Sequence, residues 1–329
     1  MTLNASIFGP EGPEITSFER DFFRDTQPFG FILFARNIVE PTQLRRLTAE
    51  LREAVGRDAP ILVDQEGGRV QRMRSPYWRE FLPALDQMTR ARDPMRAHWI
   101  RNRLIADDLR SVGIDVNCAP LADIAEAQTH PFLYNRLYGQ DVATVVAAAR
   151  VCADALLSGG VLPVLKHIPG HGRANVDSHL GLPRVEAPIA SLHEKDFAPF
   201  RALSDLPMGM SAHIVFDAID PTGPATTSEK MINVIRKDIG FDGLLMTDDL
   251  SMEALSGTVA ERAAASIQAG CDLALHCNGK APEMQAVAEA AGLMTEAAQK
   301  RANSALSARR PPENVDIAAL EAELEALLA

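Results

Sequence analysis

The chain has 329 residues, 47% of them hydrophobic and 23% charged, a composition typical of soluble globular proteins that excludes disorder and fibrous repeats. Its formal net charge of −11 argues against a nucleic-acid partner, because binding to phosphates requires a basic face. No apolar run approaches about 18 residues, so we expect no transmembrane helix and no membrane partner. Four scattered cysteines and the lack of a basic, apolar leader segment favour the cytoplasm.

Short apolar segments of strand length recur along the whole chain. Most of them are apolar on both faces, as expected of strands in a parallel sheet that helices cover. They span residues 3–8, 30–35, 61–64, 115–119, 162–166, 208–213, 244–247 and 272–276.

Longer segments with helical spacing separate these predicted strands. In the first, Pro41 stands near the start, and Leu44, Leu47 and Leu51 recur on one face. In a later one, Ser228 is a good N-cap. The predicted helices span residues 40–54, 94–112, 142–158, 190–203, 228–239, 259–269 and 281–302.

Eight strands separated by helices predict an α/β fold, a single (β/α)8 TIM barrel. The alternative, an open doubly wound sheet, is weakened because no GxGxxG segment follows an early strand. We expect residues 1–310 to form the catalytic barrel domain. Residues 311–329 begin with two prolines and continue as an acidic amphipathic pattern, which predicts a C-terminal helical tail packed on the barrel.

Reactive side chains stand where the predicted strands end, which is where TIM barrels carry their active sites. Asp64 ends the third strand, Lys166 and His167 end the fifth, His213 ends the sixth, and Asp248 and Asp249 follow the seventh. A structural network of buried ion pairs would look similar, but four such coincidences on one rim favour a functional site.

A loop rich in histidine follows the fifth strand. Gly170 and Gly172 flank His171 and allow a sharp turn or a close approach to a ligand. Asp177 and His179 are two residues apart, so the carboxylate can orient the imidazole and raise its basicity. This pair suits general acid or base chemistry.

A metal site is a weaker interpretation of the same loop. The spacing of its histidines matches no ligand motif, and Lys166 would repel a divalent cation. We therefore expect no metal and no cofactor. The residues that this interpretation would use are His167, His171, Asp177 and His179.

Two further roles stay open at this point. Asp248 and Asp249 compete for the role of nucleophile or electrostatic stabiliser, and since successive strand residues face opposite sides, only one can point into the barrel mouth. The other should turn to the helical layer or cap the next segment. Lys166 can serve as a Schiff-base lysine or as a hydrogen-bond donor to substrate hydroxyls.

Four segments are similar to a known family when taken together. The segments VDQEGGRVQR at 63–72, KHIPGHG at 166–172, DSH at 177–179 and TDDLSM at 247–252 resemble bacterial β-N-acetylglucosaminidases of glycoside hydrolase family 3, the cytoplasmic enzymes of peptidoglycan recycling. The resemblance runs in order from about residue 9 to 277. Ile168 and Thr247 stand where the family usually has Phe and Ser.

The resemblance implies a retaining glycosidase that removes non-reducing terminal β-linked N-acetylglucosamine from peptidoglycan fragments such as GlcNAc-anhydroMurNAc-peptides. It implies a covalent glycosyl-enzyme, and we expect a monomer acting on this small-molecule substrate. The roles implied are nucleophile for Asp248, acid/base for His179 with Asp177 as its partner, and substrate binding for Asp64, Arg72, Arg136, Lys166 and His167.

Two other activities remain as alternatives, a Schiff-base aldolase or lyase using Lys166 and a family-3 N-acetylglucosaminide phosphorylase. The acidic chain would not attract an anionic cell-wall fragment. We therefore expect Arg72, Arg136 and Lys166 to supply a local positive field.

Overall fold

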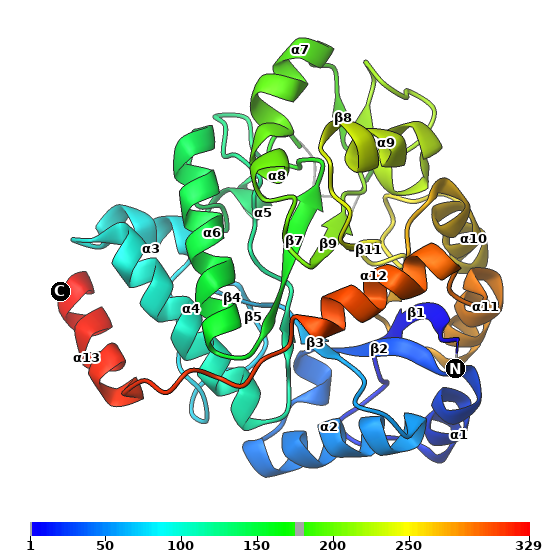
Figure 1. Cartoon of the computed structure of the whole chain (residues 1–329), viewed down its shortest axis with the longest axis horizontal. Helices are drawn as coiled ribbons and strands as arrows, with labels where there is room; N and C mark the ends of the chain where they lie inside the picture. Colours follow the sequence, from blue (N-terminus) through cyan, green and yellow to red (C-terminus); the bar gives the residue numbers. More distant parts are fainter. Residues whose placement is uncertain (1, 175–180) are drawn as a thin grey trace.

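The computed structural model describes residues 2–174 and 181–329. Its main sheet is parallel throughout, in the order β11-β9-β7-β6-β3-β2-β1-β12. The two outer strands meet through a parallel bridge between Met246 and Leu273, so the sheet curls into a nearly closed barrel (Figure 1). The strands are β1 (Asn4–Phe8), β2 (Pro28–Leu33), β3 (Ile61–Val63), β6 (Val116–Asn117), β7 (Leu162–Ile168), β9 (Met208–Ser211), β11 (Leu244–Met246) and β12 (Ala274–His276).

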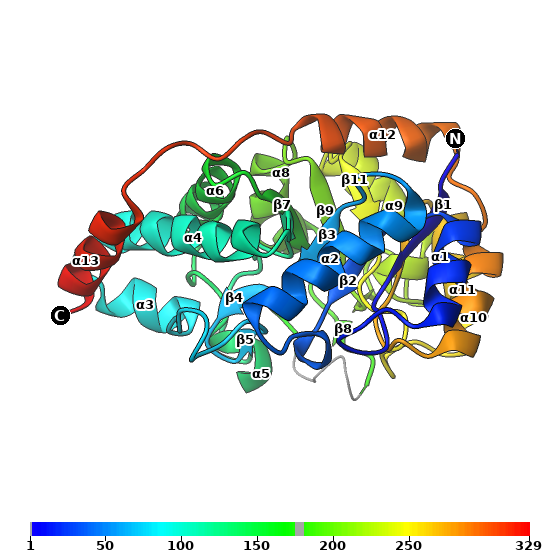
Figure 2. The same ribbon diagram turned by 90° about the horizontal axis from the view of Figure 1, so that it is seen from below.

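Helices surround this barrel, as two perpendicular views show (Figures 1 and 2). The predicted (β/α)8 fold is therefore confirmed. The α-helices are α1 (Ser17–Thr26), α2 (Pro41–Val55), α3 (Ala84–Arg90), α4 (Pro94–Ser111), α5 (Pro131–Tyr134), α6 (Val142–Ser158), α7 (Ile189–Ser191), α8 (Ala198–Ala202), α9 (Glu229–Asn233), α10 (Val259–Ala269), α11 (Ala281–Ala291), α12 (Glu296–Ser307) and α13 (Ile317–Leu328).

Shorter elements complete the fold. Short 3₁₀ helices are η1 (Ala35–Asn37) and η3 (Ala225–Thr227), and single π turns are η2 (Leu192–Asp196) and η4 (Val234–Asp238). Two small sheets lie outside the barrel: the antiparallel hairpin of β4 (Gln65–Gly67) and β5 (Val70–Gln71), and the parallel pair β8 (Arg184–Val185) and β10 (Val215–Phe216).

All eight predicted strands are present, but the predicted helix 281–302 is wrong as one element. Gly292 adopts a φ of 64°, which ends α11, and the side chain of Thr295 then caps α12. Helix α1 was not predicted, although a capping box of Thr16 and Glu19 marks its start. The N-cap role of Ser228 is confirmed, since its hydroxyl accepts the Met231 N–H at 3.2 Å.

The C-terminal segment crosses one side of the barrel and ends beside α4 (Figure 2). On α13, Leu320 and Leu324 are buried, and Glu323 accepts two 2.7 Å hydrogen bonds from Arg96. These contacts agree with packing on the barrel exterior, while the division of the chain at residue 310 stays a prediction. No described helix is long and apolar enough to cross a bilayer.

Candidate active site

A cavity of about 930 Å³, counted with its solvent-open space, lies at the carboxyl ends of the strands. Side chains reach it from β7 and from the segments directly after β3 and β11. The β4–β5 hairpin region and the loop after α5 add three arginines, Arg69, Arg72 and Arg136. Every described residue for which a site role was predicted lines this cavity. These residues are Asp64, Arg72, Arg136, Lys166, His167 and Asp248.

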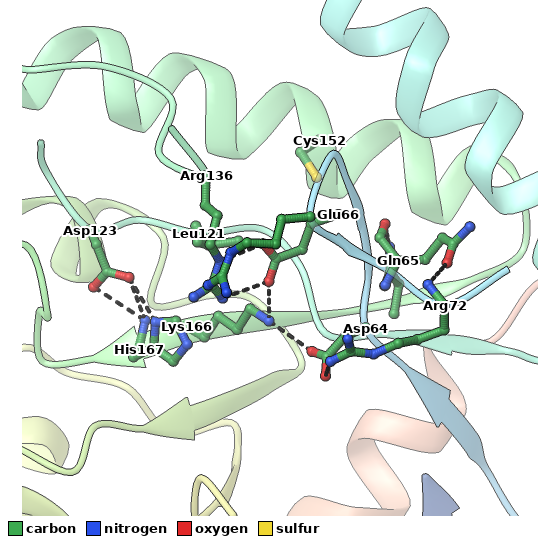
Figure 3. A network of polar contacts seen from close by, with 12 residues as sticks. Asp64, Gln65, Glu66, Arg72, Leu121, Asp123, Arg136, Cys152, Lys166 and His167 are labelled. Carbon is green, nitrogen blue, oxygen red and sulfur yellow. Dashed lines mark hydrogen bonds and ion pairs between the residues drawn. The ribbon is translucent and has the colours of Figure 1, made fainter. Parts of the chain in front are cut away.

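Lys166 stands at the centre of a buried ion-pair network (Figure 3). Its Nζ lies 2.9 Å from an Asp64 oxygen and 2.6 Å from a Glu66 oxygen. Arg136 holds both oxygens of Glu66, at 2.9 and 2.8 Å, in the bidentate geometry that guanidinium favours. Arg72 donates to the other Asp64 oxygen at 3.2 Å. The network fixes these five side chains before any ligand binds.

The pKa shifts of Lys166 and Glu66 favour the charged form of each group. Burial alone would lower the pKa of Lys166, but Asp64 and Glu66 outweigh burial and raise it well above its usual range. Burial would raise the pKa of Glu66, yet Arg136 and Lys166 lower it to about 2. A Schiff-base lysine needs the opposite shift, so these contacts disfavour the aldolase alternative.

The expected local positive field is largely balanced by the acidic partners of these cations. Arg72, Arg136 and Lys166 carry three positive charges, but Asp64 and Glu66 carry two negative ones, so the five-residue network has a net charge of only +1. The cations are therefore mainly directional hydrogen-bond donors. They attract a distant anionic substrate only weakly.

The β4–β5 hairpin positions Glu66 and Arg72, and its shape depends on a glycine. Gly67 has a φ of 97°, and a Cβ at this position would lie 2.0 Å from the Arg101 guanidinium. Arg101, itself buried, donates to the Glu66 carbonyl and to the Gln87 side chain at 3.0 Å. Glu66 and Arg101 were not singled out as site residues, although Glu66 lies inside the first family-like segment.

Asp248 and Asp249 divide their tasks. Asp248 is partly buried and lines the cavity, and one of its oxygens accepts the Asp249 N–H at 2.8 Å. Burial would raise its pKa, but His213, His167 and this N–H lower it, so the carboxylate is ionised. Asp249 also lines the cavity, but its carboxylate accepts the N–H groups of Ser251 at 3.0 Å and Cys277 at 3.2 Å. It caps the following turn, as one of the two was expected to do.

His213 lies just after β9 and supports this segment, and this role was not predicted. The ring is fully buried, with Nδ1 2.8 Å from the Thr226 hydroxyl and Nε2 3.0 Å from the Asp249 carbonyl. Burial lowers its pKa, while the Asp248 and Asp249 carboxylates act in the opposite direction. Donation from Nε2 to the Asp249 carbonyl fixes the backbone next to Asp248.

His167 and His171 occupy another wall of the cavity. The His167 Nδ1 atom lies 2.8 Å from a carboxylate oxygen of Asp123, a residue that was not predicted. Burial lowers the pKa of His171 to about 4, so this ring is neutral, and its Nδ1 has no hydrogen-bond partner among the described residues. Gly170 has a φ of 139°, and a Cβ on Gly172 would lie 2.0 Å from the Ile124 carbonyl, so the loop needs both glycines.

The predicted acid/base pair, Asp177 and His179, lies outside the described residues. Among residues 2–174 and 181–329, no group of three His, Cys, Asp or Glu side chains is arranged to hold a metal ion. What the described cavity offers is an ionised carboxylate, Asp248, together with a set of charged donors and acceptors. This arrangement suits a polar, hydroxyl-rich ligand.

Comparison with known proteins places this site in a family. The Glycosyl hydrolase family 3 N terminal domain matches residues 14–306. A β-hexosaminidase of Alkalilimnicola ehrlichii is 37% identical over 286 residues, which is 84% of this chain and 82% of the relative. A β-hexosaminidase of Methylococcus capsulatus is 35% identical over 309 residues, 92% of this chain and 89% of the relative.

Solved structures agree with the sequence relatives. NagZ from Neisseria gonorrhoeae, in complex with N-trifluoroacetyl-D-glucosamine, is similar with a TM-score of 0.89 and 28% identity, covering 100% of this chain and 99% of that one. Mycobacterial LpqI (M. tuberculosis) is similar with a TM-score of 0.79 and 28% identity, covering 93% and 92%. The chain therefore belongs to glycoside hydrolase family 3 and is a glycosidase of its bacterial β-hexosaminidase branch.

Proposed function

We propose that the protein is a retaining β-N-acetylhexosaminidase that releases non-reducing terminal β-linked N-acetylglucosamine, with Asp248 as the nucleophile. The observation that carries this proposal is the state of Asp248: an ionised, partly buried carboxylate that lines the cavity and, among the described residues, accepts the backbone N–H of Asp249. Such a carboxylate can bond to an anomeric carbon, which is the first requirement of retaining hydrolysis.

The reaction proceeds in two displacements. Asp248 attacks the anomeric carbon while the glycosidic C–O bond breaks, and His179 gives its proton to the departing oxygen. Water then attacks the glycosyl-enzyme, His179 takes a proton from it, and the bond to Asp248 breaks. The roles of His179 and its partner Asp177 rest on the DSH segment and its family resemblance. Most retaining glycosidases use a second carboxyl group here, so a His–Asp pair is a departure from that pattern.

The ion-pair network is suited to hold the sugar ring. Charged donors and acceptors form stronger hydrogen bonds than neutral ones, and a network fixed in advance loses little entropy when a ligand binds. Asp64 accepts from sugar hydroxyls, and the guanidinium and ammonium groups donate to them. The residues with this role are Asp64, Arg72, Arg136, Lys166 and His167.

The use of an imidazole as the acid that protonates the leaving group favours a peptidoglycan fragment as the natural substrate. Muropeptides carry carboxylates near the scissile bond, and a glutamate acid would be repelled by them. An imidazole acid starts cationic and ends neutral, so it avoids this repulsion. We propose that the protein acts on GlcNAc-anhydroMurNAc-peptides in the cytoplasm, as a monomer.

The test is hydrolysis of an aryl β-N-acetylglucosaminide compared with the matching aryl β-glucoside. We expect rapid release of the aryl group from the first and little from the second. Added phosphate should not yield sugar 1-phosphate, which a phosphorylase would form. Equal rates on both glycosides would contradict the assignment to N-acetylglucosamine.

A further inference from the structure

Asp123 lies beside β7 because the chain after β6 continues along that strand. Ala122 donates its N–H to the Lys166 carbonyl at 2.8 Å, and Lys166 donates to the Pro120 carbonyl at 3.0 Å. This pairing places the Asp123 carboxylate next to His167 (Figure 3). The carboxylate is buried, and it does not line the cavity itself.

The Asp123 carboxylate collects three N–H donors. One oxygen lies 2.8 Å from His167 Nδ1, and the other accepts the backbone N–H of His171 at 2.7 Å. The backbone N–H of His167 lies 3.3 Å from both oxygens. Burial would raise the pKa of Asp123, but the hydrogen bonds that it accepts from the His167 ring and from the His171 N–H favour its ionised form, and its pKa is lowered. An ionised carboxylate can only accept hydrogen bonds.

The tautomer of His167 follows from this partner. Because Asp123 only accepts, Nδ1 must carry the proton, and in the neutral ring Nε2 then holds a lone pair. Nε2 is the ring nitrogen left for a ligand, and the ring lines the same cavity as Asp248. A lone pair at this position accepts a hydrogen bond from a hydroxyl group.

We propose that Asp123 is a positioning residue that holds His167 in the Nδ1–H form, so that Nε2 accepts a hydrogen bond from a hydroxyl of the substrate sugar. The same carboxylate anchors the backbone at His171, where the Pro-Gly-His-Gly loop leaves the barrel. This inference rests on the proposed function for the identity of the sugar. The tautomer itself depends only on the described contacts.

The test combines nitrogen NMR with kinetics on Asp123→Asn. Two-bond ¹H–¹⁵N spectra of the ¹⁵N-histidine protein report the tautomer, and His167→Gln identifies the His167 signals among the eight histidines. We expect the wild-type ring to be protonated at Nδ1. In Asp123→Asn, the amide N–H₂ can face Nδ1, so we expect protonation at Nε2. Losing this charged hydrogen bond should lower kcat/KM about 10- to 100-fold.

A double-mutant cycle separates positioning from a purely structural role. If Asp123 acts through His167, Asp123→Asn added to His167→Gln should lower kcat/KM by no more than about twofold further. If Asp123→Asn lowers kcat/KM by the same factor in the wild type and in His167→Gln, the proposal is overturned. A wild-type ring protonated at Nε2 would overturn it too, and that measurement does not depend on any variant of Asp123.

Asp115→Asn is the matched control. Asp115 is also a buried carboxylate and accepts the Ile61 N–H at 2.8 Å, but it stands at the amino end of β6, away from the cavity. We expect this variant to keep kcat/KM. If wild-type enzyme does not cleave the aryl N-acetylglucosaminide, the proposed function fails, whereas the NMR result still decides the role of Asp123.

Discussion

Replacing Glu66 by glutamine tests whether the ion-pair network holds the site together. The change keeps the shape of the side chain and one carbonyl oxygen, but removes the negative charge that Lys166 contacts at 2.6 Å and Arg136 at 2.8 Å. Both cations are almost fully buried. The variant therefore leaves buried positive charge with only Asp64 to compensate it.

The size of the effect follows from the Glu66 pKa. A carboxyl whose pKa falls from its ordinary 4.5 to about 2 stabilises the folded state by about 3 kcal/mol at neutral pH, at about 1.4 kcal/mol for each pH unit. This agrees with the cost of about 3–5 kcal/mol for breaking a buried ion pair. Since the folded pKa is depressed, the contribution is complete above pH 4.5 and is lost as the pH falls toward 2.

Urea unfolding measures the difference in unfolding free energy between the wild type and Glu66→Gln. It is carried out from pH 7 down to the lowest pH at which both proteins stay folded. We expect the difference to be about 3 kcal/mol at pH 7 and to shrink steadily below pH 4.5. Glu323→Gln, at an exposed bidentate pair with Arg96, is the control and should change stability far less. A Glu66→Gln difference that is small at pH 7, or that does not vary with pH, would refute the reasoning.

Three further predictions concern the site and its support. Asp248→Asn should lower kcat on an aryl β-N-acetylglucosaminide by at least about 10³-fold without loss of fold, measured by kinetics and circular dichroism; near-normal kcat would remove the nucleophile assignment. Gly67→Ala should lower the unfolding free energy by more than Gly56→Ala, because both sites have positive φ (97° and 62°) but only the first crowds the Arg101 guanidinium; equal losses would contradict this packing. Borohydride with a carbonyl substrate should trap no adduct on Lys166, because its ammonium stays protonated, and mass spectrometry of the Lys166 peptide checks this.

The barrel could be predicted from the sequence because its strands are apolar on both faces. Each predicted strand has a counterpart in the sheet, and helices 142–158 and 259–269 have the predicted bounds. The break at Gly292 was missed because apolar spacing continues across it; the positive φ of Gly292 ends α11, and the Thr295 cap starts α12. Periodicity does not detect such a break when both helices pack on the same barrel.

The site was predicted only as far as each residue could be recognised by itself. Asp64 and Asp248 follow strands and Lys166 lies near the carboxyl end of β7, so their common rim follows from the barrel. Asp123 contacts His167 across 44 positions of the chain, and Glu66 contacts Arg136 across 70. These pairs form because the fold brings distant strands and loops side by side. A single sequence carries no direct signal of which distant residues will meet.

The choice between two adjacent carboxylates is the central claim, and covalent trapping tests it most directly. A slow 2-fluoro glycosyl substrate accumulates the glycosyl-enzyme, and peptide mapping of the labelled protein locates the bond. The contacts of Asp249 with Ser251 and Cys277 hold its carboxylate in a cap, so the label should fall on Asp248. A label on Asp249, or on no carboxylate at all, would contradict the account.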